Sequence, residues 1–209
     1  MLTDSTRERI LDAAVQQASL YGLSALSLGD LARAAGMSKS GFYAHFGSRE
    51  VLESAVVDAI VHEFRTRVWA PHEASDPGAQ RLRTIVADWK RWVDGSTFAG
   101  GCPIVAVAVD LDDRPGEARE RLAHAERGWL RTLAREFAAI RDSVRIVSLD
   151  ERRATELRNN VAGYGYMARF LEVPSASDTL DDIVDRLIDE AGAVGSDTLG
   201  EQGRGHAHA

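Results

Sequence analysis

The segment Ser38–Arg49 (SKSGFYAHFGSR) gathers hydroxyl, lysine, tyrosine, histidine and arginine side chains within twelve residues. Short side chains with hydrogen-bond donors can bind base edges in a DNA major groove about 12 Å wide, and cationic side chains can bind phosphates. The sequence contains no glycine-rich phosphate loop, nucleophile elbow or metalloprotease motif. These residue types therefore predict a contact with a nucleic acid and no catalytic residues.

Three predicted helices position this segment. Apolar residues recur with helical spacing over Arg7–Tyr21. Ser27 is followed three residues later by an aspartate, the spacing of a capping box, and would begin a short helix that ends at Gly36. A second short helix is expected over Lys39–His45. Two short helices joined by a glycine turn and supported by a preceding helix predict a helix-turn-helix.

The second short helix would turn its polar side chains away from a small apolar core. That polar set is Lys39, Ser40, Tyr43 and His45. Ser48 would then cap a long connecting helix over residues 49–70, whose first N–H groups and Arg49 are suited to hold a phosphate. The alternative is a three-helix structural subdomain that binds no DNA.

Helical periodicity also predicts the elements of the remaining chain. Further helices are expected over 82–93, 117–138, 154–171 and 178–194. The segment Cys102–Leu111 is ambiguous, because its β-branched residues would also suit a buried strand. A single strand would have no partner, so we expect a short helix with Pro103 at its first position.

The predicted fold class is all-α, with about nine helices. The expected domains are a helix-turn-helix DNA-binding domain at 1–48, a helical ligand-binding and dimerisation domain at 49–194, and a disordered tail at 195–209.

Composition limits the compartment and the partners. The chain has 209 residues, a formal net charge of −7, 44% apolar residues and one cysteine. Residues 1–50 carry five basic and five acidic side chains, so the acidic excess lies in the remainder. A single cysteine excludes an internal disulfide framework, and no apolar run approaches the ~20 residues of a membrane span. We expect a cytoplasmic protein with no signal peptide and no membrane partner.

Two features could bind a metal or sense redox state. Cys102 lies at a predicted helix N-cap, where the helix dipole can lower a thiol pKa, although a small buried thiol is the simpler interpretation. His206 and His208 form a His-x-His pattern in the predicted tail, which lacks the fixed geometry of a metal site. We therefore expect no metal and no cofactor.

The run Leu26–Leu52 (LSLGDLARAAGMSKSGFYAHFGSREVL) resembles the DNA-binding segment of TetR/AcrR-family transcriptional regulators. The resemblance implies that Lys39, Tyr43 and Arg49 contact phosphates. The full set of DNA-contact candidates is Arg33, Ser38, Lys39, Ser40, Gly41, Tyr43, His45, Ser48 and Arg49. Gly41 stands where the family more often has threonine or alanine, which leaves the operator sequence open. The run Gly101–Pro103 resembles one subgroup of the family.

The resemblance also implies a ligand pocket and a dimer interface after the DNA-binding domain. The pocket candidates are Trp89, Trp92, Phe98, Cys102, Val105, Val109, Trp129, Leu133, Phe137, Tyr164 and Met167. Aromatic residues that only fill a core are the alternative. The interface candidates follow the 3.5-residue repeat of a helix that packs along a partner helix. They are Leu157, Val161, Gly165, Ala168, Leu180, Val184, Leu187 and Ala191.

Together these features predict a homodimeric, ligand-responsive DNA-binding transcription factor. We expect a repressor that binds a palindromic double-stranded operator and is released by a small apolar effector. Two alternatives stay open: a helical small-molecule-binding protein or enzyme without DNA binding, and an activator of the same family.

Overall fold

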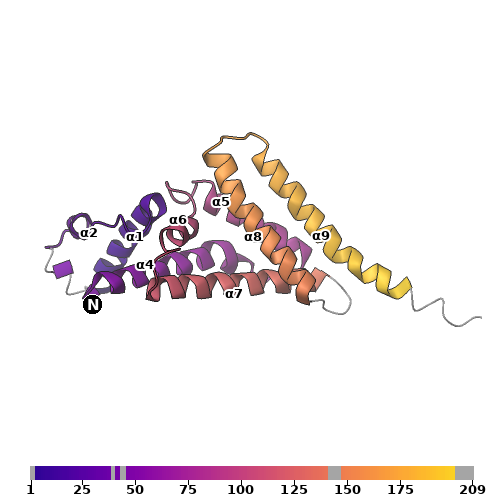
Figure 1. The fold of residues 1–209 in the computed structure, drawn as a ribbon, viewed down its shortest axis with the longest axis horizontal. Coiled ribbons are helices and arrows are strands. Elements are labelled where there is room, and N and C mark those ends of the chain that lie inside the picture. Colours follow the sequence, from indigo (N-terminus) through magenta and orange to yellow (C-terminus); the bar gives the residue numbers. More distant parts are fainter. Residues whose placement is uncertain (1–2, 39–40, 43–45, 141–146, 201–209) are drawn as a thin grey trace, which may run out of the picture. The chain divides into compact units, whose positions relative to one another are not determined.

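The computed structural model describes residues 3–38, 41–42, 46–140 and 147–200, and every regular element in these ranges is helical (Figure 1). The α-helices among the described residues are α1 (Thr3–Tyr21), α2 (Leu28–Ala34), α4 (Arg49–Phe64), α5 (Ala79–Val93), α6 (Pro103–Asp110), α7 (Glu117–Ile140), α8 (Val147–Arg169) and α9 (Ala176–Gly200). A π-helical turn (Arg65–Trp69) and a 3₁₀ turn (Ala70–His72) follow α4. The predicted all-α fold is confirmed.

Serine caps set the helix starts near the N-terminus, as the sequence predicts. The Ser27 hydroxyl accepts a hydrogen bond from the Asp30 N–H at 3.2 Å and begins α2. At the other end of α2, Gly36 takes a left-handed φ of 68°. The Met37 N–H then bonds back to the Ala32 carbonyl at 2.9 Å, so the chain turns sharply out of the helix.

The contacts divide the chain into two compact units. Unit 1 contains residues 1–70 and 91–126, and unit 2 contains residues 71–90 and 127–209. The division falls within α5 and α7, because each of these helices contributes residues to both units. This division does not follow the predicted boundary at residue 48, which stays a prediction.

The core of unit 1 forms where α1 packs against α2, α4 and α6. Ile10, Ala14 and Ala18 lie on one face of α1 and are buried, which confirms the predicted apolar face. The loop before α6 lies directly on the end of α1: a Cβ atom built on Gly100 would stand 1.9 Å from the Ser19 carbonyl oxygen. Only glycine fits at this position.

Unit 2 contains the α8–α9 helical hairpin. Buried leucines and valines from both helices pack in its interior.

A buried ion pair also lies in unit 2. The Glu136 carboxylate accepts hydrogen bonds from Arg81 Nε at 2.9 Å and from the Gly78 N–H at 3.2 Å. Paired and hydrogen-bonded in this way, the two charges can remain ionised inside the unit.

Two helix assignments can be compared with the prediction. Residues Pro103–Asp110 form a helix with Cys102 at its N-cap, which excludes the strand alternative. Helix α9 continues to Gly200, so the prediction of disorder from residue 195 is wrong for its first six residues. The residues after Gly200 lie outside the described residues, as do His206 and His208.

Candidate nucleic-acid interface

We call Ser38–Arg49 the recognition segment. Of this segment the structure describes Ser38, Gly41, Phe42 and residues 46–49. The Ser38 hydroxyl accepts a hydrogen bond from the Gly41 N–H at 3.1 Å, and the Ser38 carbonyl accepts one from the Phe42 N–H at 3.0 Å. These two bonds begin a helical turn. Four of its predicted DNA-contact residues lie outside the described residues: Lys39, Ser40, Tyr43 and His45.

Two phenylalanines anchor the segment to the interior of unit 1. Phe42 and Phe46 are four residues apart, both are buried, and their ring centroids are 5.2 Å apart. The Arg7 guanidinium of α1 lies over the Phe46 ring at 5.3 Å from its centroid. The two buried rings therefore hold this segment against the core of unit 1.

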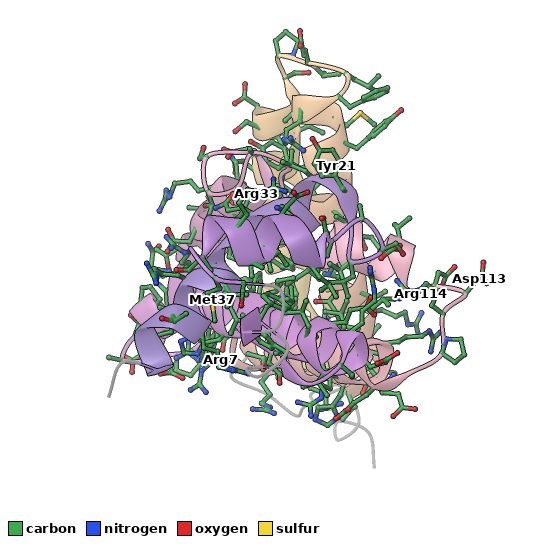
Figure 2. The ribbon with its side chains drawn as sticks, turned by 90° about the vertical axis from the view of Figure 1, so that its left-hand side faces the viewer. Arg7, Tyr21, Arg33, Met37, Asp113 and Arg114 are labelled. Carbon is green, nitrogen blue, oxygen red and sulfur yellow. The ribbon has the colours of Figure 1, made fainter. Side chains whose placement is uncertain are left out.

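Arg33 lies on the exposed surface of α2, and Figure 2 shows it on the same side of unit 1 as Met37. Its side chain is 80% exposed and bonds only to Asp30 at 2.9 Å among the contacts of the described residues. An exposed pair of this kind contributes little to stability and can open at little cost. The position therefore suits the predicted contact with a DNA backbone.

The start of α4 differs from the prediction. The Ser48 hydroxyl accepts a hydrogen bond from the Val51 N–H at 3.3 Å and caps the helix as expected. Arg49, in contrast, turns toward the protein: it donates to the carbonyls of Leu23 and Ser24, each at 2.9 Å, and to Glu53 Oε1 at 2.9 Å. These bonds occupy most of its donors and do not favour the predicted phosphate contact of Arg49, which stays untested.

A polar cluster, which we call the Asp110 clasp, joins the α1–α2 turn to α4 and α6. Asp110 at the end of α6 accepts hydrogen bonds from the Ser24 hydroxyl at 2.6 Å and the Ser24 N–H at 2.8 Å. Arg114 donates to Asp110 at 3.1 Å, to Ser24 at 2.8 Å and to Glu53 at 2.9 Å. Figure 2 shows Arg114 beside Asp113 on the loop after α6.

The clasp favours the ionised form of Asp110. Burial alone would raise the pKa of this carboxyl group, but the hydrogen bonds from Ser24 and the charge of Arg114 outweigh burial, and the pKa lies below its usual value. Sequence reasoning missed this cluster, because Ser24 is 86 positions away from Asp110 in the chain. A lone aspartate at the end of the apolar helix α6 is the one available signal.

The pocket candidates in unit 1 form an aromatic core. Trp92 packs edge-to-face against Phe64 and Phe98, with ring centroids 5.3 Å and 4.9 Å away. The indole N–H of Trp92 donates to the Cys102 sulfur at 3.2 Å. Val105 is half-buried, whereas Val109 is 74% exposed. Such exposure contradicts the prediction that Val109 lines an enclosed pocket.

The pocket candidates in unit 2 are also mainly core residues. Trp89 packs edge-to-face on Trp129 with centroids 5.3 Å apart, and Leu133 and Phe137 are fully buried. Tyr164 is half-buried beneath the Lys90 ammonium, 5.8 Å from its ring centroid. Met167 is 43% exposed, which is again wrong for an enclosed pocket.

The predicted dimer interface is wrong for six of its eight residues. Leu157, Val161, Leu180, Val184, Leu187 and Ala191 are buried within the single chain. Their repeat reflects the packing of α8 and α9 inside one subunit. The remaining two, Gly165 and Ala168, are half-buried.

An exposed apolar cluster lies instead at the end of α8. Its members are Tyr166, Met167, Phe170 and Leu171. Phe170 is 73% exposed, and its ring stacks on Tyr166 with centroids 5.2 Å apart. Sequence reasoning missed most of this cluster because its residues lie at the end of the repeat.

The described residues contain no helix long and apolar enough to span a membrane. Within the same ranges, no group of three or more histidine, cysteine, aspartate and glutamate side chains is placed to hold a metal ion.

Comparisons with solved structures show the fold. A TetR transcriptional regulator from Chloroflexus aurantiacus J-10-FL is 23% identical, with a TM-score of 0.75 over 90% of this chain and 94% of that one. A TetR-family regulator from Cytophaga hutchinsonii is 22% identical, with a TM-score of 0.76 over 91% of this chain and 96% of that one. AibR, solved with isovaleryl coenzyme A and operator DNA, is 17% identical, with a TM-score of 0.65 over 88% of this chain and 98% of that one.

Family models identify both parts of the chain. No curated protein matches the sequence significantly. The model for bacterial regulatory proteins of the tetR family matches residues 10–56, and the model for the tetracyclin repressor-like C-terminal domain matches residues 78–183, half of the chain. With a helix-turn-helix at its N-terminus and a helical C-terminal domain, the chain belongs to the TetR family of DNA-binding transcriptional regulators.

Proposed function

We propose that this regulator is a cytoplasmic repressor that binds a palindromic operator as a homodimer and leaves it when a small apolar effector binds. TetR-family proteins are transcription factors and not enzymes, which removes the enzyme alternative. The observation that carries the proposal is the helical turn at Ser38, anchored by buried Phe42 and Phe46. Each subunit would read one half-site, with the two centres about 34–36 Å apart.

The proposed DNA contacts come from residues 38–48 and from Arg33 on α2. Lys39 and Tyr43 would bind phosphates, and Ser38, Ser40, Gly41 and His45 would lie at or near base edges. Ser48 and Arg33 would contact the backbone at the two sides of the groove. Arg49 is left out, because its guanidinium already bonds to the α1–α2 turn and to Glu53.

The proposed dimer contact is the exposed cluster Tyr166, Met167, Phe170 and Leu171. Contiguous apolar surface of this kind is typical of protein contacts. Gly163, one turn earlier on α8, is exposed, and a Cβ atom there would meet no atom within 4 Å. This open space would let a helix of the second subunit approach closely, which offsets the cost of glycine within a helix.

The effector must bind better to a conformation in which the two DNA-binding domains are wrongly spaced. AibR was solved with isovaleryl coenzyme A, a ligand with a branched apolar acyl group. For this chain we propose an effector with a small apolar part bound by the C-terminal domain. The Asp110 clasp would carry the change, because it joins α6 to the α1–α2 turn through hydrogen bonds of 2.6 Å, 2.8 Å and 2.8 Å. A coupling of about 1–3 kcal/mol would suffice for regulation.

The test begins with selection of bound genomic fragments by the purified full chain, followed by fluorescence anisotropy on the selected duplex. Lys39→Ala and Tyr43→Ala should each weaken binding by about tenfold or more, since each removes a phosphate contact. Arg127→Ala removes an exposed charge of α7 and is the matched control. If the Lys39 and Tyr43 variants bind as tightly as the parent while the control is also unchanged, the assignment of the recognition segment is wrong.

A further inference from the structure

A small pocket lies in unit 1 beside the Asp110 clasp, between the start of α4 and the start of α7. Its volume is about 220 Å³, and α4 lines it with Arg49, Glu50, Glu53 and Ser54. Leu111 and residues 114–119 line the rest. Because a water molecule takes up about 30 Å³ in the liquid, a phosphate or a carboxylate with several waters fits this space.

The first turn of α7 supplies hydrogen-bond donors to this pocket. The Glu120 N–H bonds to the Gly116 carbonyl at 3.1 Å, which is the first bond of the helix. The N–H groups of residues 117–119 come before it and have no carbonyl partner within the helix. Gly116 has no side chain with which to cap them. A long helix with an uncapped N-terminus attracts anions, because its N–H groups and its dipole both favour negative charge.

Ser54 is a second observation, independent of the helix N-terminus, that points to a ligand. It is only 5% exposed and lines the pocket, and its hydroxyl has no hydrogen-bond partner among the described residues. Asp58, one turn later on the same face of α4, bonds to Arg121 of α7 at 2.6 Å. Ser54 therefore faces the first turn of α7. Buried hydroxyls are rarely left without a partner, so the Ser54 hydroxyl is available to bond a ligand in this pocket.

Arginines pair with two of the three carboxylates that line the pocket. Both oxygens of Glu53 are already bound, one by Arg49 and one by Arg114, each at 2.9 Å. Glu117 is bound by Arg121 at 3.0 Å. Glu50 is exposed, and its pKa is lowered by hydrogen bonds from its own backbone N–H and from Ser48. Glu53 and Glu117 are thus each paired with arginine, which reduces the negative charge that an anion would meet, while Glu117 Oε2 and the Glu50 carboxylate remain as acceptors.

Arginine donors remain available on the same side. The Arg119 guanidinium is held near the pocket by a 3.3 Å hydrogen bond from its Nε to the Asp112 carbonyl, and its terminal nitrogens extend beyond that bond. Arg114 also lines the pocket while it bonds to the clasp. An arginine guanidinium, helix N–H groups and a serine hydroxyl are a common donor set for oxyanions.

We propose that this pocket binds a small oxyanion, a phosphate or carboxylate group, and that the anion regulates DNA binding through Arg114. The binding itself does not depend on the proposed repressor function, whereas its regulatory effect rests on that function. An anion that draws Arg114 toward α7 would weaken the hydrogen bonds of Arg114 to Ser24 and Asp110. The contact between α6 and the α1–α2 turn would then be less stable.

Isothermal titration calorimetry of the full chain with inorganic phosphate, in a chloride buffer, tests the binding. One saturable site is expected, and acetate in a parallel titration shows whether a carboxylate also binds. Ser54→Ala and Arg119→Gln should each lower the phosphate affinity by about tenfold, since each removes a donor to an anion. Arg127→Gln is the control with an equal loss of charge, and its affinity should equal that of the parent.

Ser54→Ala also separates a ligand site from a packing defect. It removes a hydroxyl without a partner, so the variant should fold with an unchanged or higher melting temperature in chloride buffer and should gain less from added phosphate than the parent. Absence of saturable binding, or equal phosphate affinity in the parent, S54A and R119Q, would mean an adventitious ion only and would overturn the site.

Operator binding measured with and without phosphate tests the regulatory part. Saturating phosphate should weaken operator binding of the parent by about fivefold or more, while added chloride of equal ionic strength should not. If phosphate binds but operator affinity is unchanged, the regulatory effect is refuted and the site stands. If the parent binds no DNA at all, the repressor proposal fails, and the calorimetric result on the site is unaffected.

Discussion

Replacement of Asp110 by asparagine tests whether the clasp holds the α1–α2 turn to α6. The introduced amide would keep the shape of the side chain but has one acceptor oxygen in place of two. In the parent, the two carboxylate oxygens accept bonds of 2.8 Å and 2.6 Å from Ser24 and 3.1 Å from Arg114. The carboxylate is 18% exposed, so water can replace part of what is lost.

The expected cost of Asp110→Asn follows from these bonds. A hydrogen bond to a charged group contributes about 1.5–3 kcal/mol to stability. The asparagine retains the bond from the Ser24 N–H and loses the charge that strengthens the other two. With partial replacement by water, we expect a loss of about 2 kcal/mol at pH 7.

Urea unfolding followed by circular dichroism measures this loss. Asp112→Asn, two residues later on an exposed turn, is the matched control and should change the free energy of unfolding by less than about 0.5 kcal/mol. A loss in D110N that is no larger than in D112N would refute a stabilising role of the clasp.

The pH dependence of the same comparison gives a second check. Because the pKa of Asp110 is lowered in the folded protein, the carboxylate contributes its full stability above the unfolded pKa of about 3.9. That contribution is lost as the pH falls through the lower, folded pKa of Asp110. The stability difference between parent and D110N should therefore be constant from about pH 5 to 7 and shrink below pH ~4. A difference that does not change with pH would contradict the ionised clasp.

Three further variants test other parts of the structure. Arg49→Ala should lower the free energy of unfolding by about 2 kcal/mol, since it leaves carbonyls of the α1–α2 turn without a charged donor. The same variant should leave the salt dependence of DNA binding unchanged. A smaller slope of log affinity against log salt concentration would restore Arg49 as a phosphate contact. Glu136→Gln should cost about 3 kcal/mol in urea unfolding, because it leaves the Arg81 charge buried without its partner; a cost under about 1 kcal/mol would show that water reaches the pair. Phe170→Ser should raise the dimer dissociation constant measured by sedimentation equilibrium and leave the circular dichroism spectrum unchanged, since the ring is 73% exposed within one subunit. An unchanged dissociation constant would exclude this cluster from the interface.

Local sequence signals predicted the helices well where the deciding interactions are also local. Ser27 and Ser48 cap α2 and α4 through bonds to N–H groups three residues later, and such spacing can be read directly from the chain. The segment Pro103–Asp110 was ambiguous by periodicity, and its N-terminal proline favoured the helix that forms.

Predictions that depended on which neighbour a helix meets were less successful. The repeat at Leu157, Val161 and Leu187 indicates a helix that packs along another helix, but it cannot say whether that helix belongs to the same subunit. The two helices that pack together are α8 and α9 of the same chain.

Contacts between distant parts of the chain could not be predicted at all. Arg49 has the residue type of a phosphate ligand, yet three hydrogen-bond acceptors at the α1–α2 turn and on α4 lie within its reach. Asp110 meets Ser24 across 86 positions, and although an aspartate at the end of the apolar helix α6 is unusual, nothing in the sequence indicates Ser24 as its partner. Hydrogen-bond partners of this kind appear only once the helices are packed.

The salt dependence of operator binding tests most directly whether the Ser38–Phe46 segment reads DNA. Each phosphate contact that a protein makes adds about 0.9 to the slope of log affinity against log salt concentration. For the parent we expect a steep loss of affinity with salt, and for Lys39→Ala a slope smaller by about 0.9 with an unchanged melting temperature. Equal slopes for the parent and the Lys39→Ala variant, on the selected operator, would contradict the placement of this segment against the double helix.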